Sequence, residues 1–278
     1  MNYELHIGME NKQLETQVSP RGDLEGTKVT KGTKAVIIGA SSGIGYEVTK
    51  LLLAEGWHLG VAARREEKLL ELKALAPDRI EVMTIDITHP DATERLLALI
   101  NKLGGMDLYF HASGIGWQNR TLEADIEQRT VETNALGFTR MIGSAYRYFV
   151  EKGEGHIAAI TSIAGTKGLG PAPAYSATKA LQATYLESLE QLIHQRGLRI
   201  CITDIRPGFV DTALLRPANP EKEKGFPYPM MMRPEAVARE IVCSINKRRH
   251  VRIIDWRYRI ITFFWRLIPR CLWRLIRL

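Results

Sequence analysis

Short apolar runs alternate with amphipathic segments along most of this chain, and this alternation constrains its fold more than any other feature. The apolar runs have the length of strands, and the segments between them repeat apolar residues at helical spacing. Strands are predicted at 35–39, 57–63, 80–85, 107–111, 156–160 and 199–204, and helices at 46–54, 66–76 and 91–103. Strands that alternate with helices pair in parallel, with right-handed crossovers and helices on both faces of the sheet. The predicted fold class is α/β, a doubly wound parallel sheet in a single domain spanning residues 33–250.

The basic charge is confined to the end of the chain. Residues 247–278 contain ten Lys/Arg and one acid, whereas the other 246 residues contain 28 Lys/Arg and 30 Asp/Glu, a net charge of −2. Nothing in this distribution supports a nucleic-acid-binding core, so no nucleic-acid partner is expected.

The cysteines and the first residues indicate the compartment. Cys201, Cys243 and Cys271 are widely separated, show no metal-ligand spacing and are typical of a reducing compartment. No metal is expected. Residues 1–32 are polar and lack the apolar core of a secretory signal, so a cytoplasmic protein is expected. We expect these residues to form an N-terminal extension that is either flexible or contains a short strand around Leu5.

A glycine-rich turn follows the first predicted strand. In Gly39-Ala-Ser-Ser-Gly43-Ile-Gly45 the glycines let the backbone approach a pyrophosphate, whose charge is favoured by the N-terminus of the next helix. The end of the second strand reads Ala62-Ala63-Arg64-Arg65, with no acid until Glu66. An acid there suits the ribose 2′-hydroxyl of NAD, whereas arginine suits a 2′-phosphate, so NADP(H) is the predicted cofactor; a solvated helix start is the alternative.

Tyr175 and Lys179 lie one helical turn apart in Tyr-Ser-Ala-Thr-Lys. A phenol donates a proton to a carbonyl effectively only if its pKa of about 10 is brought towards neutrality. An ammonium four residues away on the same helix face favours the phenolate. Such pairs also occur on ordinary solvated faces, so other residues must support the interpretation.

These features together resemble the short-chain dehydrogenase/reductase family, in its single-domain branch with a Tyr-x-x-x-Lys active site and a Rossmann-like fold. The resemblance covers residues 33–245. It rests on the ordered set Gly39-x-x-x-Gly43-Ile44-Gly45, Asp86, Asn134, Ser162, Tyr175, Lys179 and Pro207-Gly208, with Ser162 thirteen residues before the tyrosine.

The resemblance implies a catalytic role for four residues. Tyr175 is expected to be the general acid in reduction and the base in oxidation. Lys179 is expected to lower the pKa of Tyr175 and hold the nicotinamide ribose. Ser162 would polarise the substrate carbonyl, and Asn134 would position a water in a proton relay through Lys179.

The resemblance also implies a set of cofactor contacts. Asp86 is expected to meet the adenine amino group, and Thr212 with the Pro207-Gly208 turn to face the carboxamide. The predicted cofactor-binding residues are Gly39, Ser41, Ser42, Gly43, Ile44, Gly45, Arg64, Arg65, Asp86, Ile87, Ser113, Gly114, Tyr175, Lys179, Pro207, Gly208, Val210 and Thr212.

One motif departs from the family pattern. Where Asn-Asn-Ala-Gly is usual, this chain has His111-Ala112-Ser113-Gly114, and Ala112 cannot make the hydrogen bonds of an asparagine side chain. Because the catalytic residues are present, an active enzyme is still expected. His111 is interpreted as a structural or cofactor-adjacent side chain.

The segment 213–233 is rich in proline and ends in Met230-Met231-Met232. In the family this region forms a substrate lid. Methionines adapt to varied apolar shapes, which favours an apolar substrate; packing at a subunit contact is the alternative.

The tail, residues 251–278, is predicted to be a basic amphipathic helix kinked at Pro269. Arginines form one stripe, and the opposite side is apolar: Ile261, Phe264, Trp265, Ile268, Leu272, Leu275 and Ile276. No uncharged run approaches the roughly 20 residues that span a bilayer. The pattern is typical of a peripheral anchor on the cytoplasmic membrane face, although packing on the domain or in a homo-oligomer (dimer or tetramer) is the alternative.

The predicted function is an NADP(H)-dependent oxidoreductase that interconverts a carbonyl and a secondary alcohol. A ketone reductase for an apolar or lipid-like substrate (3-oxoacyl, ketosphingoid or sterol-like) is favoured. The alternative is a catalytically silent NADP(H)-binding regulator or scaffold at a membrane surface.

Overall fold

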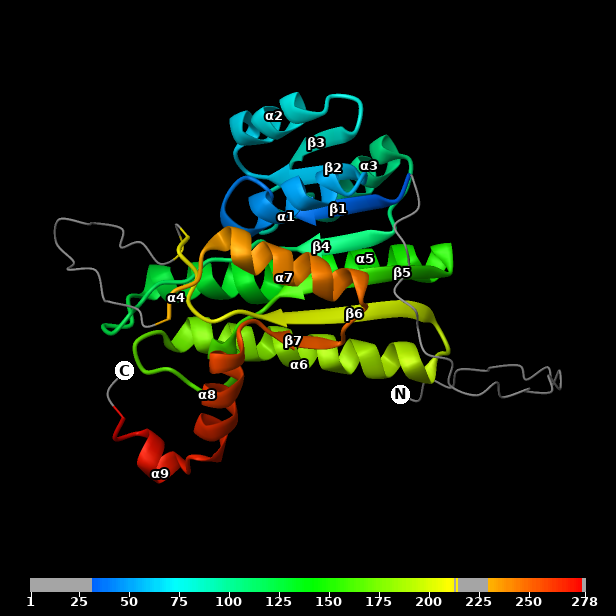
Figure 1. The fold of residues 1–278 in the computed structure, drawn as a ribbon. Coiled ribbons are helices and arrows are strands. Elements are labelled where there is room, and N and C mark those ends of the chain that lie inside the picture. The colour runs from blue at the N-terminus through cyan, green and yellow to red at the C-terminus, as the bar shows by residue number, and fades with distance from the viewer. Residues whose placement is uncertain (1–31, 213, 215–229, 277–278) are drawn as a thin grey trace, which may run out of the picture.

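A seven-stranded parallel sheet forms the centre of the computed structural model, which describes residues 32–212, 214 and 230–276 (Figure 1). Its strand order is β3-β2-β1-β4-β5-β6-β7. The strands are β1 (Lys34–Ile38), β2 (His58–Ala63), β3 (Ile80–Thr84), β4 (Leu108–His111), β5 (Glu154–Ile160), β6 (Arg199–Arg206) and β7 (Val251–Ile253). The order reverses direction between β1 and β4, and this is where doubly wound sheets bind ligands, outside the carboxyl ends of the strands.

Helices cover both faces of this sheet (Figure 1). One apolar core contains side chains of α1 (Gly43–Ala54), α2 (Glu66–Leu75), α7 (Pro234–Asn246) and α8 (Trp256–Leu267). The other contains side chains of α3 (Ala92–Leu103), α5 (Phe138–Lys152) and α6 (Pro173–Gln195). The remaining elements are α4 (Ala124–Val131), the π-helix η1 (Glu132–Gly137), the 3-10 helix η2 (Ile163–Thr166) and α9 (Arg270–Trp273).

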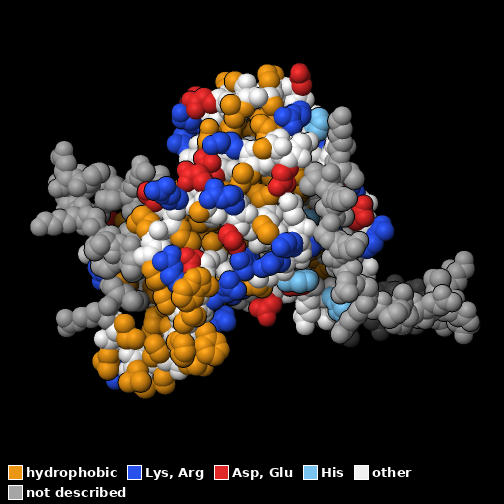
Figure 2. All heavy atoms as spheres, viewed as in Figure 1, with side chains coloured by type: hydrophobic (Ala, Val, Ile, Leu, Met, Phe, Trp, Pro, Cys, Tyr) orange, Lys and Arg blue, Asp and Glu red, His pale blue; other side chains and the backbone are white. Residues whose placement is uncertain are grey.

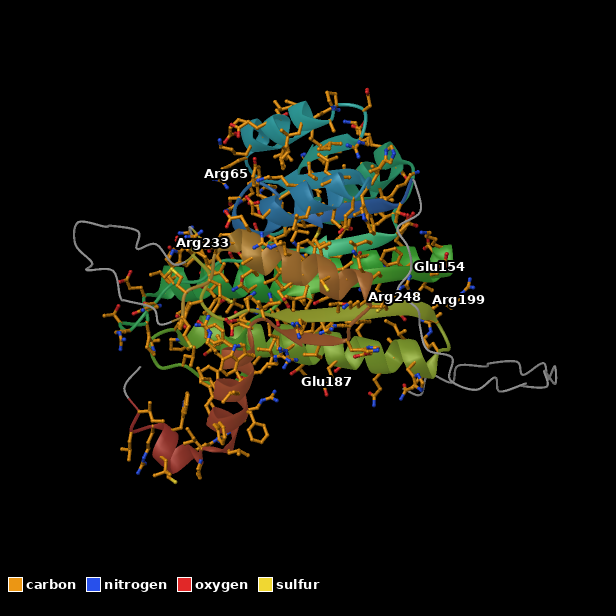
Figure 3. The ribbon with its side chains drawn as sticks, viewed as in Figure 1. Arg65, Glu154, Glu187, Arg199, Arg233 and Arg248 are labelled. Carbon is orange, nitrogen blue, oxygen red and sulfur yellow. The ribbon has the colours of Figure 1, made fainter. Side chains whose placement is uncertain are left out.

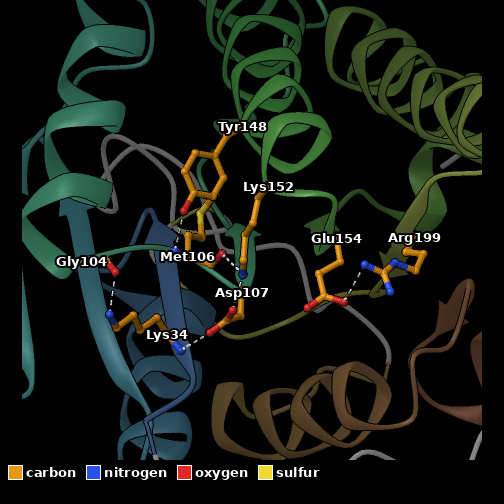
Figure 4. Close-up of polar contacts among 8 residues, drawn as sticks. All are labelled: Lys34, Gly104, Met106, Asp107, Tyr148, Lys152, Glu154 and Arg199. Carbon is orange, nitrogen blue, oxygen red and sulfur yellow. Dashed lines mark hydrogen bonds and ion pairs between the residues drawn. The ribbon is translucent and has the colours of Figure 1, made fainter.

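Polar contacts close the amino-terminal end of the sheet, away from the predicted site (Figure 4). Asp107, just before β4, accepts a hydrogen bond from the backbone N–H of Lys34 at 2.8 Å and forms an ion pair with Lys152. Lys152 also donates to the carbonyl of Met106 at 2.7 Å. These contacts hold the starts of β1 and β4 in place relative to the end of α5.

The structure confirms the predicted doubly wound, Rossmann-like α/β fold. The predicted strands and helices are all present, with bounds that differ by one or two residues in most cases and by three at the start of α1. The sheet has one strand more than the sequence indicated, because Val251–Ile253 pairs with β6. These three residues carry too few apolar positions to be distinguished from the tail that follows. The predicted extension at 1–32 lies outside the described residues, apart from Gly32.

Candidate active site

The predicted cofactor residues lie at the carboxyl end of the sheet. Figure 3 shows Arg65 on the side toward which the strands point, with Glu154 and Arg199 at the opposite end. Such placement follows from parallel pairing, because every βα connection then leaves the sheet at one edge.

The glycine turn after β1 is tightly packed. Gly39 has a φ of +91°, and a Cβ on Gly45 would lie 2.2 Å from the carbonyl oxygen of Gly39. Ser42, the residue before α1, makes no side-chain cap, and the first turn of α1 has no acid. The N–H groups at this helix start therefore have no side-chain acceptor within their own helix, which fits the diphosphate of a nicotinamide dinucleotide.

Arg65 reaches back from the end of β2 over this turn. Its guanidinium donates to the hydroxyls of Ser41 at 3.0 Å and Ser42 at 2.9 Å. Arg64 stands beside Asp86, which follows β3. Burial opposes ionisation of Asp86, yet hydrogen bonds from Thr88 and the charge of Arg64 leave its pKa below the usual value. Two cationic groups thus flank the end of β2.

Tyr175 and Lys179 occupy the first turns of α6. Pro173 begins this helix, where its missing N–H is not needed. The ammonium Nζ of Lys179 lies 5.8 Å from the centroid of the Tyr175 ring and is almost fully buried. The predicted pair is therefore present on one helix face, with Lys179 buried and Tyr175 half-buried.

The ionisation of this pair differs from the prediction. Burial raises the pKa of Tyr175, and a hydrogen bond with Ser162 opposes that shift without cancelling it. Burial also lowers the pKa of Lys179 to about 8, against the attraction of Asp204. The pKa of Tyr175 is thus shifted in the direction opposite to the expected one, because loss of hydration outweighs the hydrogen bond with Ser162.

Asn134 lies within the π-helix between α4 and α5, and it is fully buried. Its side-chain amide exchanges two hydrogen bonds with Ile115: Nδ2 donates to the carbonyl at 2.6 Å, and Oδ1 accepts from the N–H at 2.9 Å. Its main-chain carbonyl accepts from Gln182 at 2.8 Å, and Gln182 in turn accepts from Lys179 at 2.9 Å. Single-turn π-helices within α-helices occur frequently at functional sites.

Gln182 is therefore a site residue that the sequence reasoning missed. The available signal was its position, three residues after Lys179 on the same face of a helix.

Ser162 follows β5 and begins η2. Its hydroxyl accepts from the N–H of Ala164 at 3.0 Å, and the residue is buried. This cap fixes the direction of the hydroxyl oxygen while leaving its proton for another acceptor, as a group that polarises a carbonyl requires.

His111 is buried at the end of β4. Its Nδ1 shares a hydrogen bond with the hydroxyl of Tyr109 at 2.9 Å, and the ring packs edge-on against Phe138. Burial and the charge of Lys179 lower the pKa of His111 to about 3, while a hydrogen bond with the backbone of Ser113 acts in the opposite direction. A neutral, enclosed imidazole agrees with the predicted structural role, and Ala112 packs partly buried against the core in place of the family's amide.

Glycines on distant segments of the chain lie close to predicted site residues. A Cβ on Gly114 would lie 3.6 Å from Lys179 Nζ, and one on Gly116 would lie 2.5 Å from the Tyr175 ring. At the other side, a Cβ on Gly43 would lie 3.2 Å from Thr212. The structure thus brings the glycine turn and the segment after β6 together.

The remaining cofactor positions have mainly local contacts. The carbonyl of Pro207 accepts from Ile163, Gly208 lies against the Tyr258 ring, and Val210 bridges to Met232. Ile44 and Ile87 pack on the two apolar cores.

A cavity of about 550 Å³ lies beside this site, between residues 165–170 and the start of α6. It is lined by Ser176, Ala177 and Ala180. At 100° per residue, these point to another face of α6 than Tyr175 and Lys179 do, so the cavity is not where the reaction would occur. Most of the predicted lid, at 213 and 215–229, lies outside the described residues.

The tail follows β7 as two short helices separated at Pro269, in agreement with the predicted kink. The sequence predicted a single apolar side that included Ile261, Phe264 and Trp265. In the structure Ile261 and Trp265 pack against the domain, whereas Phe264 and its neighbour Phe263 are exposed. No helix of the described residues is long and apolar enough to cross a membrane.

Comparisons with known proteins agree on the family. Residues 33–223 match the model of the short chain dehydrogenases. An uncharacterized oxidoreductase of Myxococcus xanthus is 33% identical over 204 residues, which is 71% of this chain and 78% of that protein. Another, from Staphylococcus aureus, is 28% identical over 79% of this chain and 93% of its own length.

Three solved structures share the fold. An actinorhodin polyketide ketoreductase variant with NADPH has a TM-score of 0.70 at 23% identity, covering 80% of this chain and 95% of its own. A short chain dehydrogenase/reductase from Burkholderia phymatum with NAD has a TM-score of 0.73 at 19% identity, covering 84% and 92%. Serine dehydrogenase with NADP+ has a TM-score of 0.69 at 25% identity, covering 76% and 88%.

The match of the family model to most of the chain, together with the Ser162, Tyr175 and Lys179 constellation at the end of a parallel sheet, settles the relationship. The chain belongs to the short-chain dehydrogenase/reductase family of oxidoreductases.

Proposed function

We propose that this protein is an NADP(H)-dependent reductase that converts a ketone to a secondary alcohol. The observation that carries the proposal is the arrangement of Tyr175 between Ser162, which hydrogen-bonds it, and Lys179. A phenol beside a second hydroxyl and an ammonium suits proton donation to a carbonyl oxygen in the reduction direction.

Each side chain has a defined part in that reaction. A bound nicotinamide supplies the hydride. The hydroxyl of Tyr175 donates its proton to the carbonyl oxygen, and the Ser162 hydroxyl orients the same oxygen by a hydrogen bond. The charge of Lys179 stabilises the phenolate that remains. Asn134 holds the backbone around Ile115 and presents its own carbonyl toward Gln182.

NADPH rather than NADH is supported by the end of β2. Arg65 already binds two serine hydroxyls of the glycine turn, and Arg64 lies beside it. A planar guanidinium can bind a 2′-phosphate through two parallel hydrogen bonds. No acid stands at the strand end to accept from a 2′-hydroxyl; Glu66 begins α2.

An apolar, lipid-like ketone is the substrate class that we favour. Met230 and Met232 pack at the segment after β6, and the tail beside it exposes several aromatic and aliphatic side chains. Peripheral membrane contact through 251–278 and a homo-oligomeric state are proposed independently of the reaction and its substrate class.

The direct test is optical NADPH oxidation with ketones graded by chain length and carrier group, with NADH in parallel. Wild type should turn over long-chain ketones. Tyr175→Phe should lose about 10²–10⁴ in kcat, the usual contribution of general acid catalysis, while it still binds NADPH. Near-wild-type turnover of Tyr175→Phe would contradict the mechanism. Tight NADPH binding with no turnover of any ketone would favour the silent regulator.

A further inference from the structure

The inner face of the C-terminal segment is already attached to the rest of the chain. Trp265 donates from its indole to the hydroxyl of Thr166 at 2.8 Å, and Trp273 donates to the carbonyl of Gly168 at 2.7 Å. Lys167 donates to the carbonyl of Ile268 at 2.6 Å and lies over the Trp273 ring. These contacts orient α8 and α9, and so determine which side chains face outward.

The outer face is apolar. Figure 2 shows hydrophobic side chains gathered over α8 and α9, at the lower left of the molecule. Six of the described ones are between 55% and 69% exposed: Trp256, Phe263, Phe264, Leu267, Leu272 and Leu275. Isolated exposed apolar residues are ordinary, but a contiguous cluster marks an interaction surface.

The charges around this cluster are cationic. Exposed arginines accompany it at Arg259, Arg266, Arg270 and Arg274. The single acid of the segment, Asp255, lies 2.6 Å from Arg257, and no Asp or Glu follows it in the sequence. Aromatic and aliphatic groups surrounded by arginines complement an anionic, partly apolar partner.

We propose that the outer face of α8 and α9 binds an anionic lipid surface. Phenylalanine and leucine side chains enter the boundary between headgroups and acyl chains, and the arginines contact the phosphates. A second copy of this chain would place the same arginines against one another, which disfavours self-association through this face.

The position of this surface links it to the active site. The tryptophans bind residues 166–168, only four to six residues after Ser162. Lipid contact would therefore present the substrate side of the protein to the membrane, where an apolar ketone is concentrated. This second step rests on the proposed reductase function, whereas lipid binding itself does not.

Vesicle flotation tests the surface with the full-length protein. Vesicles of phosphatidylcholine, with and without phosphatidylglycerol, are compared for wild type, Phe263→Ser/Phe264→Ser and a charge variant, Arg266→Gln/Arg270→Gln. Leu70→Ser/Leu75→Ser is the matched control, because these leucines are about as exposed on α2, at the opposite end of the molecule (Figure 1).

Wild type and the leucine control should float with anionic vesicles. The phenylalanine variant should lose about tenfold or more in partitioning, since two apolar side chains no longer enter the interface. The arginine variant should lose its preference for phosphatidylglycerol. The proposal is overturned if wild type floats with neither vesicle, if all variants float alike, or if light scattering shows that the phenylalanine variant only dissociates an oligomer. NADPH binding by each variant confirms folding and is independent of whether a ketone is found.

A separate observation concerns the buried amide of Gln182. It joins Lys179 to the main-chain carbonyl of Asn134, through contacts of 2.9 and 2.8 Å, and is fully buried. Lys179 also donates to the carbonyl of Ile160 at 3.2 Å. The amide thus occupies a direct path between two groups that the family resemblance connected through water.

We infer that Gln182 is a positioning residue that holds the Lys179 ammonium in register with Asn134. Its oxygen stabilises the charged lysine, and its N–H groups fix the amide against the π-helix. Only the predicted effect of Gln182 on turnover rests on the proposed reductase function.

Other ionisable groups face Lys179 from each neighbouring element. Tyr175 lies on the same helix, His111 on β4 and Asp204 on β6, where Arg206 pairs with it at 2.6 Å. These groups are unchanged in the variants at position 182. Any difference in the titration of Lys179 between those variants therefore comes from the side chain at position 182.

Two substitutions should act in opposite directions. Gln182→Met removes the acceptor and should lower the pKa of Lys179 by about one unit, whereas Gln182→Glu adds an anion and should raise it by a similar amount. Carbon-13 labelled lysine, assigned with Lys179→Met, follows that titration by NMR without cofactor. The alkaline limb of the ketone reduction profile should move in the same two directions. Gln191→Met, on the exposed face of α6, is the matched control.

Unchanged titrations in both variants, or shifts of the same sign, would overturn the assignment. If no ketone is reduced by wild type, the reductase proposal fails while the NMR titration still tests Gln182. Should Gln182→Met not fold, the upward shift in Gln182→Glu tests the assignment alone.

Discussion

The segment that follows Ser162 is held on one side by helix α6 and on the other by helices α8 and α9, through different kinds of contact. Helix α6 holds it from within: Gly165 lies directly against the backbone of Lys179, and Ser176 accepts from the N–H of Leu169 at 3.2 Å. Helices α8 and α9 hold it from outside, through the side chains of Trp265, Trp273 and Lys167.

This difference suggests that the contact with α6 fixes the catalytic geometry, whereas the contact with α8 and α9 controls access of the substrate. Backbone contact leaves little freedom, so the distance between Ser162 and the Tyr175 pair is fixed by the fold. Side-chain hydrogen bonds near the surface are worth about 1 kcal/mol each and open more readily, so the outer attachment can adapt to a substrate or a lipid surface. The catalytic contact should therefore be intolerant of change and the outer contact adjustable.

The inner contact should give the largest effect. A Cβ on Gly165 would lie 2.6 Å from the carbonyl carbon and oxygen of Lys179, which are backbone atoms and cannot turn aside. Gly165→Ala should lower the free energy of unfolding by roughly 2–3 kcal/mol. Turnover should also fall about 10²-fold as α6 shifts. Gly168→Ala, three residues along and with no heavy atom within 4 Å, is the control. Equal urea midpoints for the two variants would show that the loop is not fixed against α6.

The next effect concerns how the free energy of unfolding depends on pH, because the ionisable Lys179 is buried. Burial lowers the pKa of Lys179 from 10.5 to about 8, so between these values the unfolded chain binds more protons than the folded one. Stability contributed by this group therefore rises with pH across that window, by about 3 kcal/mol in all.

The measurement is the difference in unfolding free energy between wild type and Lys179→Met without cofactor, at steps from pH 7 upward. Lys247→Met, at an exposed position, is the control. A difference that does not vary with pH would mean that Lys179 is hydrated in solution.

The nucleotide end should give a smaller, selective effect. Arg65→Gln removes the guanidinium above Ser41 and Ser42 and should weaken NADPH binding by roughly 10- to 100-fold, with little change for NADH. Arg199→Gln, exposed at the far end of the sheet in Figure 3, is the control. Equal loss for both nucleotides in a fluorescence titration would show that Arg65 only supports the turn.

Local spacing in the sequence predicted the strands and helices that carry the proposed site residues. The glycine turn, Ser162, Tyr175 and Lys179 each sit where a strand or helix period places them. It could not find Gln182 as a partner of Asn134, since that contact depends on how α6 packs against a π-helix 48 positions earlier.

The tail shows the same limit. Helical periodicity predicted an amphipathic segment and a break at Pro269, but periodicity cannot say which face meets the domain. That was decided by the Trp265 contact with Thr166, 99 residues away in sequence. The direction of the pKa shift of Tyr175 could not be predicted from the sequence either, because it depends on burial, which is set by the tertiary structure.

The outer contact should give the smallest effect, and one that depends on the substrate. Trp273→Phe removes the hydrogen bond to Gly168 but keeps an aromatic ring beside Trp265, at a cost of about 1 kcal/mol. If α8 and α9 shape access rather than chemistry, KM for a long-chain ketone should rise roughly threefold to tenfold with kcat unchanged. A short ketone should show no change. Trp256→Phe, at a tryptophan that is 64% exposed, is the control. A fall in kcat shared by all ketones would instead place the tail among the elements that fix the catalytic geometry, and the distinction between the two attachments would then be lost.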